Sequence, residues 1–284
     1  MTDPGAVRGG AGLHAADPDD VGDTLRRVAG CGPYFAVGTG AVDEPGWRPV
    51  RALYENPVVL AGLVERVRTR LGTGQWRVAA SILFQGHAAR LWSVSLGALL
   101  RGGLLPDLDP DALLWRDQGG SVRLHLDRTE GWRGEDLENA LGCSVIDEHL
   151  TPLLTAVHRL APLSGRLLWG NAASALLGAA RVLDDAPVGP ARGVAERLLR
   201  QAPLRGTLQV QPEGRHRRRS CCLFYRVPGG GLCGDCALTQ FPTPPHRATH
   251  MSPSTDTSAV LRVPRGGYRT RGDHQPNGVS QQGR

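Results

Sequence analysis

Apolar side chains recur with helical spacing over several stretches of the chain. Asn56 suits the N-cap of one such helix and Pro57 its first position. The apolar positions that follow are Val59, Leu60, Leu63, Val67 and Leu71. Comparable patterns predict helices at residues 17–30, 76–102, 134–161, 164–185 and 193–201.

One region has the pattern of a β-hairpin instead. Residues 113–115 and 122–126 are mostly apolar or alternate apolar with polar, and Gly119 and Gly120 lie between them. Glycine supplies the positive φ angles that a tight hairpin turn needs. A further short strand is expected within residues 206–212. The pattern therefore predicts an α+β fold: a predominantly helical body with a β-hairpin, followed by a small C-terminal segment.

Composition divides the chain into four parts. With 284 residues and 40% hydrophobic content, the chain can bury a sizeable core. We expect a flexible leader at residues 1–17, the helical body at 18–212, a cysteine-rich segment at 213–240 and a disordered basic tail at 241–284. The tail is rich in proline, serine, threonine and glycine, and these residues supply little core.

The N-terminal residues lack the apolar core of a secretory signal, and no later run reaches the length of a membrane span. We therefore expect a cytoplasmic protein without a transmembrane segment, with peripheral association with a membrane surface left open. Structural disulfides are rare in the reducing cytosol, so clustered cysteines indicate metal ligands or redox groups.

Four of the six cysteines fall within sixteen positions and form the pattern C-C-x10-C-x2-C: Cys221, Cys222, Cys233 and Cys236. The C-x2-C pair encloses Gly234 and Asp235, which favour a tight turn. Pro228 and the three glycines after it predict a chain reversal between the two pairs. Successive side chains of an extended strand point to opposite sides, so both adjacent cysteines reach one centre only if the backbone bends there.

This spacing leaves three interpretations open. A [2Fe–2S] cluster takes four thiolates and spreads them over two irons. A zinc ion is usually held by two C-x2-C turns, of which only one is present. Free thiols or a vicinal disulfide are the third possibility. Cys31 and Cys143 stand apart in the sequence and are expected to be packing residues. His87 and His158 are expected to be surface or core residues rather than ligands.

Positive charge is concentrated towards the C-terminus. Residues 1–200 have a net charge of −2 and residues 201–284 one of +8. The run at 215–219 can be a solvated surface, can raise the potential of a cluster, or can dock an anionic substrate or redox partner. The candidate docking residues are Arg215, Arg217, Arg218 and Arg219. No nucleic-acid recognition motif accompanies them, so nucleic acid is not an expected partner.

The stretch RRRSCCLFYRVPGGGLCGDCAL (217–238) resembles the C-terminal signature of the FhuF-type ferric siderophore reductase family. Two upstream helices, LLWGNAASALLGAARVL and RVAASILFQGHAARLWSVSLGALL, resemble helices of that family more weakly, so that the resemblance covers roughly residues 20–240. It implies one [2Fe–2S] cluster held by Cys221, Cys222, Cys233 and Cys236. It also implies one-electron reduction of siderophore-bound Fe(III) to Fe(II), which releases the iron in the cytosol.

Two other functions stay open at this point. One is a zinc-stabilised interaction module, and the other is a cluster-bearing electron carrier or an accessory of siderophore biosynthesis. The chain has no dinucleotide-binding fingerprint, so an external electron donor is expected. The sequence specifies neither the siderophore nor the oligomeric state. The stretch Trp169-Gly170-Asn171 predicts either a close helix contact, with Asn171 bonded to backbone, or part of a substrate pocket.

Overall fold

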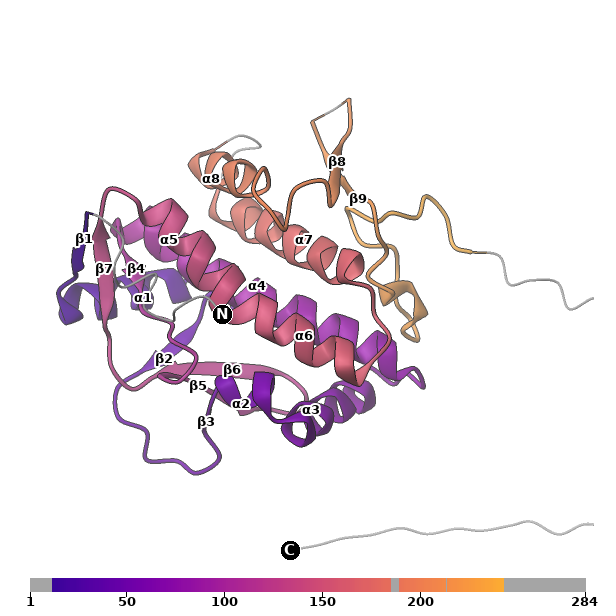
Figure 1. Ribbon diagram of the computed structural model, residues 1–284, viewed down its shortest axis with the longest axis horizontal. Helices are drawn as coiled ribbons and strands as arrows, with labels where there is room; N and C mark the ends of the chain where they lie inside the picture. Colours follow the sequence, from indigo (N-terminus) through magenta and orange to yellow (C-terminus); the bar gives the residue numbers. More distant parts are fainter. Residues whose placement is uncertain (1–11, 185–188, 213, 243–284) are drawn as a thin grey trace, which may run out of the picture. The chain divides into compact units, whose positions relative to one another are not determined.

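The computed structural model describes residues 12–184, 189–212 and 214–242 (Figure 1). The helices are α1 (Pro18–Ala29), α2 (Arg51–Glu55), α3 (Pro57–Arg70), α4 (Trp76–Gly102), α5 (Leu137–Cys143), α6 (Thr151–Leu160), α7 (Gly165–Leu183) and α8 (Pro190–Leu198). A π-helical stretch, η1 (Ser144–Leu150), joins α5 to α6, and a short 3-10 helix, η2 (Phe224–Arg226), lies in the cysteine-rich segment. None of the helices described here is long and apolar enough to cross a membrane.

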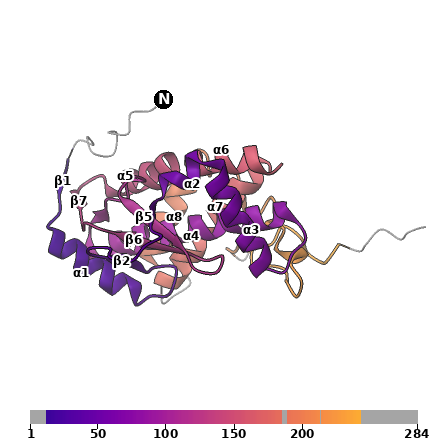
Figure 2. The ribbon, with the colours of Figure 1, turned by 90° about the horizontal axis from the view of Figure 1, so that it is seen from below.

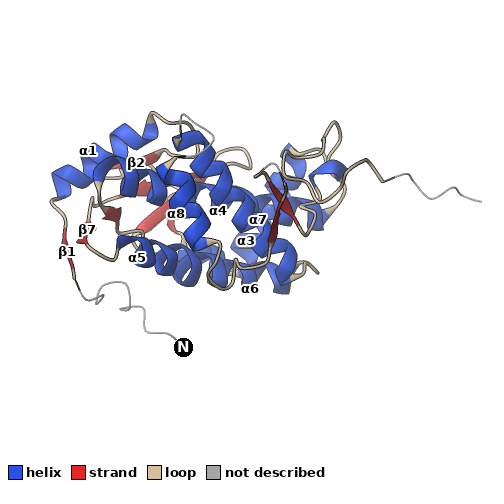
Figure 3. Ribbon diagram, turned by 90° about the horizontal axis from the view of Figure 1, so that it is seen from above, coloured by secondary structure: helices blue, strands red, loops and turns tan. Residues whose placement is uncertain are grey.

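Helix α4 is the centre of the body, and most of its length is buried. It packs along α7 and also contacts α1 and α3, an arrangement that Figures 2 and 3 show from opposite sides. Many of its apolar residues, including Phe84 and Trp92, are fully buried in the core. Because α4 is in contact with so many other elements, several of its polar side chains, among them Ser81 and His87, are also buried.

Three small sheets complete the described part of the chain. They are formed by β1 (Leu13–Ala15), β2 (Val37–Thr39), β3 (Arg48–Pro49), β4 (Leu105–Pro106), β5 (Leu113–Asp117), β6 (Val122–Leu126), β7 (Gly131–Gly134), β8 (Leu208–Val210) and β9 (His216–Arg218). Their orders are β2-β6-β5-β3, β1-β7-β4 and β8-β9. The predicted hairpin is β5-β6, in which Leu113 pairs with Leu126 and Asp117 with Val122.

The fold class predicted from the sequence, α+β with a predominantly helical body, is confirmed. Asn56 caps α3 as expected, because its side-chain oxygen accepts the backbone N–H groups of Val58 and Val59. The helix predicted at 134–161 differs in two respects. It begins only at Leu137, because Gly134 belongs to β7, and the π-helical η1 interrupts it. The last helix of the body begins at Pro190 and ends at Leu198, three residues earlier than predicted.

The predicted flexible leader needs a correction. Leu13–Ala15 form strand β1, which pairs antiparallel with β7. Alternation over three residues is too short to be recognised in the sequence, and the strand exists because β7 offers it a partner edge. Residues 1–11 of the predicted leader and residues 243–284 of the predicted tail lie outside the described residues.

The cysteine-rich segment packs against α4 and α7. The Ser81 hydroxyl on α4 donates a hydrogen bond of 2.8 Å to the Cys222 carbonyl oxygen. On α7, a Cβ added to Gly170 would collide with the Ser220 hydroxyl, so the glycine allows residue 220 to approach the helix. Ser220 in turn donates to the Arg166 carbonyl oxygen at 3.1 Å. The segment is thus attached to the two longest helices of the body.

Candidate iron–sulfur site

The backbone turns sharply after the two adjacent cysteines. Leu223 has a φ of +71°, which is unusual for a residue with a side chain and is the only positive φ among the described non-glycine residues. The Leu223 amide donates to Cys221 Sγ at 3.3 Å and the Phe224 amide to Cys222 Sγ at 3.5 Å. The bend that the sequence required for both sulfurs to serve one centre is therefore present, and each sulfur accepts a backbone hydrogen bond.

The second pair of cysteines also lies on a turn. The Cys236 amide donates to the Cys233 carbonyl oxygen at 3.0 Å, and the Leu238 amide donates to Cys236 Sγ at 3.4 Å. The chain reversal before it depends on glycine, because Gly229 has a φ of +69° and a Cβ on Gly230 would collide with the Phe224 carbonyl oxygen. Both turns predicted from the sequence are confirmed.

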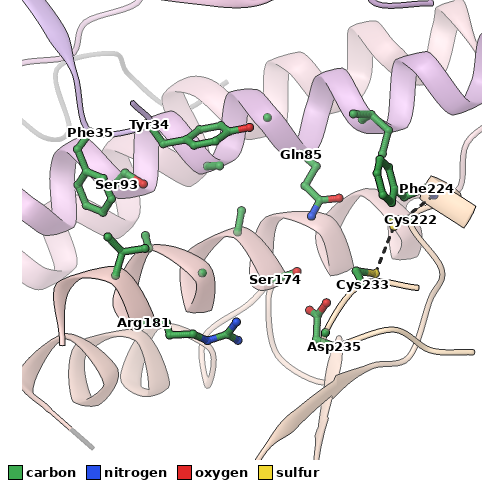
Figure 4. Close-up of a pocket in the computed structure, with 18 residues that line it drawn as sticks. Tyr34, Phe35, Gln85, Ser93, Ser174, Arg181, Cys222, Phe224, Cys233 and Asp235 are labelled. Atoms are coloured by element: carbon green, nitrogen blue, oxygen red, sulfur yellow. Dashed lines mark hydrogen bonds between the residues drawn. The ribbon is translucent and has the colours of Figure 1, made fainter. Parts of the chain in front are cut away.

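Two of the four sulfurs are in direct contact. Cys222 Sγ and Cys233 Sγ are 3.6 Å apart (Figure 4). Their hydrogen bond, helped by a neighbouring arginine and the Phe224 amide, lowers the pKa of Cys222 to about 5, and the same hydrogen bond raises the pKa of Cys233. Burial raises the pKa of Cys221. No group of three or more His, Cys, Asp or Glu side chains within the described residues is placed to hold a metal ion.

Arg218 provides a buried positive charge next to these sulfurs. Its guanidinium donates to Cys222 Sγ at 3.4 Å and to Cys233 Sγ, and it lies 3.2 Å from the Asp235 carboxylate. Burial alone would lower the pKa of Arg218, but the charges of Asp235 and the two cysteines raise it. Its Nε is buried without a hydrogen-bond partner among the described residues. The arginine therefore stays charged where sulfur-bound negative charge would develop.

A chain of hydrogen bonds fixes the position of this arginine. The Asn171 side-chain oxygen accepts from Arg218 at 3.1 Å. The Asn171 amide nitrogen donates to the Ser81 carbonyl oxygen at 3.2 Å and to the Ser81 hydroxyl at 2.9 Å. The predicted backbone bond of Asn171 is thus present, whereas the close contact at Gly170 is made with Ser220 of the cysteine-rich segment and not with another helix as predicted. The contact with Arg218 was not predicted, because it joins residues 47 positions apart in the sequence.

The arginines of residues 215–219 do not act as one surface. Arg218 cannot dock a partner as predicted, because its side chain is fully buried. Arg217 is half-buried and donates to the carbonyl oxygens of Cys236 and Ala237, which holds the C-x2-C turn against β9. Arg215 and Arg219 are exposed. Successive side chains of β9 point to opposite sides of the strand, so Arg217 and Arg218 face different surroundings. The sequence did not reveal that β9 pairs with β8.

Cys31 and Cys143 are both partly buried against the hydrophobic core, as expected of packing residues. The expectation for His87 is also met, because His87 is a core residue that belongs to a second polar cluster. The Tyr54 hydroxyl lies 2.9 Å from His87 Nε2 and 2.7 Å from His149 Nδ1, and His149 Nε2 lies 2.6 Å from the Leu108 carbonyl oxygen. His158 is exposed, with Nδ1 2.8 Å from the Leu163 carbonyl oxygen.

The donors in this second cluster can be assigned. The carbonyl oxygen can only accept, so His149 carries its proton on Nε2 and accepts from Tyr54 at Nδ1. The Tyr54 oxygen then accepts from His87 Nε2. Burial lowers the pKa of His87 to about 3 and that of His149 to about 4, so both rings are neutral near pH 7.

An open cavity lies beside the cysteines. Its volume is about 460 Å³, and its walls come from the loop after α1, from α4 and from α7. Figure 4 shows Gln85 extending from α4 towards α7, with Cys222 and Cys233 at one end. The cavity brings together residues from four separate parts of the chain, so it could not be seen in the sequence.

It is the chemistry of these residues, rather than the spacing of all four sulfurs in this structure, that fits an iron–sulfur cluster. The donor set is four thiols, and three of the sulfurs accept a hydrogen bond from a backbone N–H group. The buried Arg218 guanidinium offsets negative charge on the sulfurs. The reduction potential of a cluster depends on such hydrogen bonds and on the net charge around it. This donor chemistry is that of an iron–sulfur protein.

Residues 218–238 match the family model of the FhuF 2Fe-2S C-terminal domain. The match confirms the resemblance found in the cysteine spacing, and it supports one [2Fe–2S] cluster as the cofactor. No curated protein matches the chain.

Proposed function

We propose that this protein is a ferric siderophore reductase, in which one electron passes through the [2Fe–2S] cluster to siderophore-bound Fe(III). The observation that carries the proposal is the cysteine segment, which has the FhuF 2Fe-2S pattern and lies against an open cavity lined by Cys222 and Cys233. A redox centre beside a cavity that can admit a small molecule is suited to reduce that molecule directly.

The proposed ligands of the cluster are Cys221, Cys222, Cys233 and Cys236. When bound, the cluster supplies a one-electron carrier. The chain's own residues hold the thiolates in place, with backbone amides of residues 223, 224 and 238 directed at the sulfurs. Arg218 keeps a positive charge beside them. A nearby positive charge favours the more negative, reduced state, and so raises the reduction potential.

Release of iron follows from its ligand preferences. Hydroxamate and catecholate oxygens are hard donors that bind Fe(III) tightly and the larger, less charged Fe(II) far more weakly. One electron therefore loosens the complex without breaking a covalent bond of the chelator. We propose an external protein or soluble reductant as the electron donor, and Arg215 and Arg219, which are exposed, as candidates for docking it.

Anaerobic purification followed by chelate reduction tests this function. We expect a coloured protein with two irons per chain, which after reduction by dithionite transfers electrons to a ferric siderophore and forms Fe(II) that a colorimetric chelator traps. A colourless protein containing one zinc would support the zinc-stabilised interaction module instead. A coloured protein that reduces no ferric siderophore would support the electron carrier or biosynthetic accessory.

A further inference from the structure

The cavity between α4 and α7 has an apolar rim. Tyr34, Val182 and Phe224 line it and are 44%, 54% and 36% exposed, which is unusual for large apolar side chains in this structure. Arg90 lies over the Tyr34 ring at 4.7 Å and supports its position. Exposed apolar side chains gathered around one opening indicate a surface that contacts a ligand.

Gly178 keeps part of this cavity open. It lies inside α7, where glycine is less favourable than alanine by about 1 kcal/mol. The residue lines the cavity, and a Cβ added to it would meet no atom within 4 Å. Close packing of helices therefore does not require this glycine. A side chain at this position would instead occupy the cavity. The lower helix stability that glycine causes at position 178 is therefore explained if a ligand fills the open space.

The charge of the lining limits what the cavity can accept. Among the described residues, its charged side chains are Arg181 and Asp235, and the Asp235 carboxylate is already paired with Arg218. A ligand with several negative charges would find few partners for them and would lose its hydration. A neutral or singly charged ligand with an apolar surface matches the lining better.

We propose that this cavity is the binding site of the ferric chelate, that Gly178 keeps it open, and that it favours neutral or singly charged chelates with an apolar surface. The inference rests on the proposed function. Because Cys222 and Cys233 form one end of the cavity, a bound chelate lies close to the redox centre. One electron from an external one-electron reductant converts its Fe(III) to Fe(II). No bond to the protein forms, and the iron then leaves the weakened chelate.

Gly178→Leu is the decisive variant, because it fills the cavity without altering a cysteine or Arg218. Gly165→Leu is the matched control, since a Cβ at Gly165 also meets no atom within 4 Å but this residue does not line the cavity. Binding is measured with neutral gallium(III) tris-hydroxamate, which has the shape of the ferric complex and cannot accept an electron. Reoxidation of the dithionite-reduced protein by the ferric complex is followed by stopped flow.

For Gly178→Leu we expect unchanged visible absorption, at least tenfold weaker gallium-chelate binding and at least tenfold slower reoxidation by the ferric chelate. Gly165→Leu should match the wild type in all three. Gallium tris-catecholate, with three negative charges, should bind the wild type at least tenfold more weakly than the neutral chelate.

Equal binding by the wild type and Gly178→Leu, or no binding by either, would overturn the cavity assignment. Equal binding of both gallium chelates would overturn the charge preference. If the wild type binds the gallium chelate and Gly178→Leu does not, but no ferric chelate is reduced, the cavity assignment stands and the proposed reductase function fails.

Discussion

Helix α4 contributes to two buried polar clusters of opposite character. His87 on α4 joins Tyr54 and His149 in a neutral cluster. Ser81 on the same helix joins Asn171 and, through it, the charged Arg218 beside the cysteines. The neutral cluster holds separate helices together with hydrogen bonds. The second cluster keeps a formal charge buried, which is unfavourable unless opposite charge lies beside it. The Asp235 carboxylate and the sulfurs of Cys222 and Cys233 supply that charge.

The difference shows that burial of polar groups does not by itself identify a functional site. Both clusters are enclosed, and each contains a nitrogen without a partner among the described residues: His87 Nδ1 in one and Arg218 Nε in the other. Only the second contacts sulfur atoms and borders an open cavity.

Replacement of the proposed cluster ligands should abolish the cluster. Serine at position 221, 222, 233 or 236 replaces a thiolate by a harder oxygen donor, and a [2Fe–2S] cluster with one unprotected iron is labile. Each variant should lose most of its visible absorption and bound iron after anaerobic purification. Cys31→Ser and Cys143→Ser are the controls and should keep the colour. If Cys221→Ser leaves the spectrum unchanged while Cys222→Ser abolishes it, the adjacent sulfurs do not both bind.

Arg218→Met should change both the potential and the stability. Loss of the positive charge makes reduction less favourable, so the midpoint potential should become more negative. It also leaves the largely buried Asp235 carboxylate unpaired, which should destabilise the fold by about 3 kcal/mol.

A redox titration and urea unfolding would measure these two effects. Arg219→Met is the matched control, because the adjacent side chain is exposed and its replacement should change neither value appreciably. A potential that shifts equally in both variants would mean that Arg218 has no special effect on the cluster.

Acid should weaken the neutral cluster. The pKa values of His87, about 3, and His149, about 4, lie below that of a histidine in the unfolded chain, near 6.5. The unfolded state therefore binds protons first, so stability is constant above pH 6.5 and falls as the pH decreases towards 4 and then 3. By pH 5 the loss should be about 2 kcal/mol for each histidine.

Urea unfolding of the wild type between pH 7.5 and 5 would measure this loss. His87→Gln retains a hydrogen-bond donor for Tyr54 without a titrating ring, so it should have roughly half the pH dependence. An unfolding free energy that does not change across this range would contradict the assignment of both rings as neutral.

The sequence predicted the parts of the structure that depend on local pattern. Asn56 and Pro57 marked the start of α3. The cysteine spacing indicated a metal or redox segment, and the [2Fe–2S] cluster was predicted only through the resemblance of residues 217–238 to the FhuF-type family. Strand β1 and the parallel pairing of β2 with β6 were missed, because three-residue strands carry no periodic signal and exist only through their partners. Arg218 was missed as a buried residue for a similar reason, since its surroundings come from α7 and from the C-x2-C turn.

Two glycines of α7 should respond in opposite ways to the same small substitution. Gly170→Ala should destabilise the protein by roughly 1 kcal/mol, because the new methyl group collides with the Ser220 hydroxyl and disturbs its hydrogen bond to Arg166. Gly178→Ala should stabilise it by about 0.5–1 kcal/mol through helix propensity alone, since nothing lies within 4 Å of the added Cβ. Thermal unfolding measures both changes. We infer that Gly170 lies against the cysteine-rich segment whereas Gly178 borders open space. Variants that shift the unfolding temperature in the same direction would contradict this difference between the two glycines.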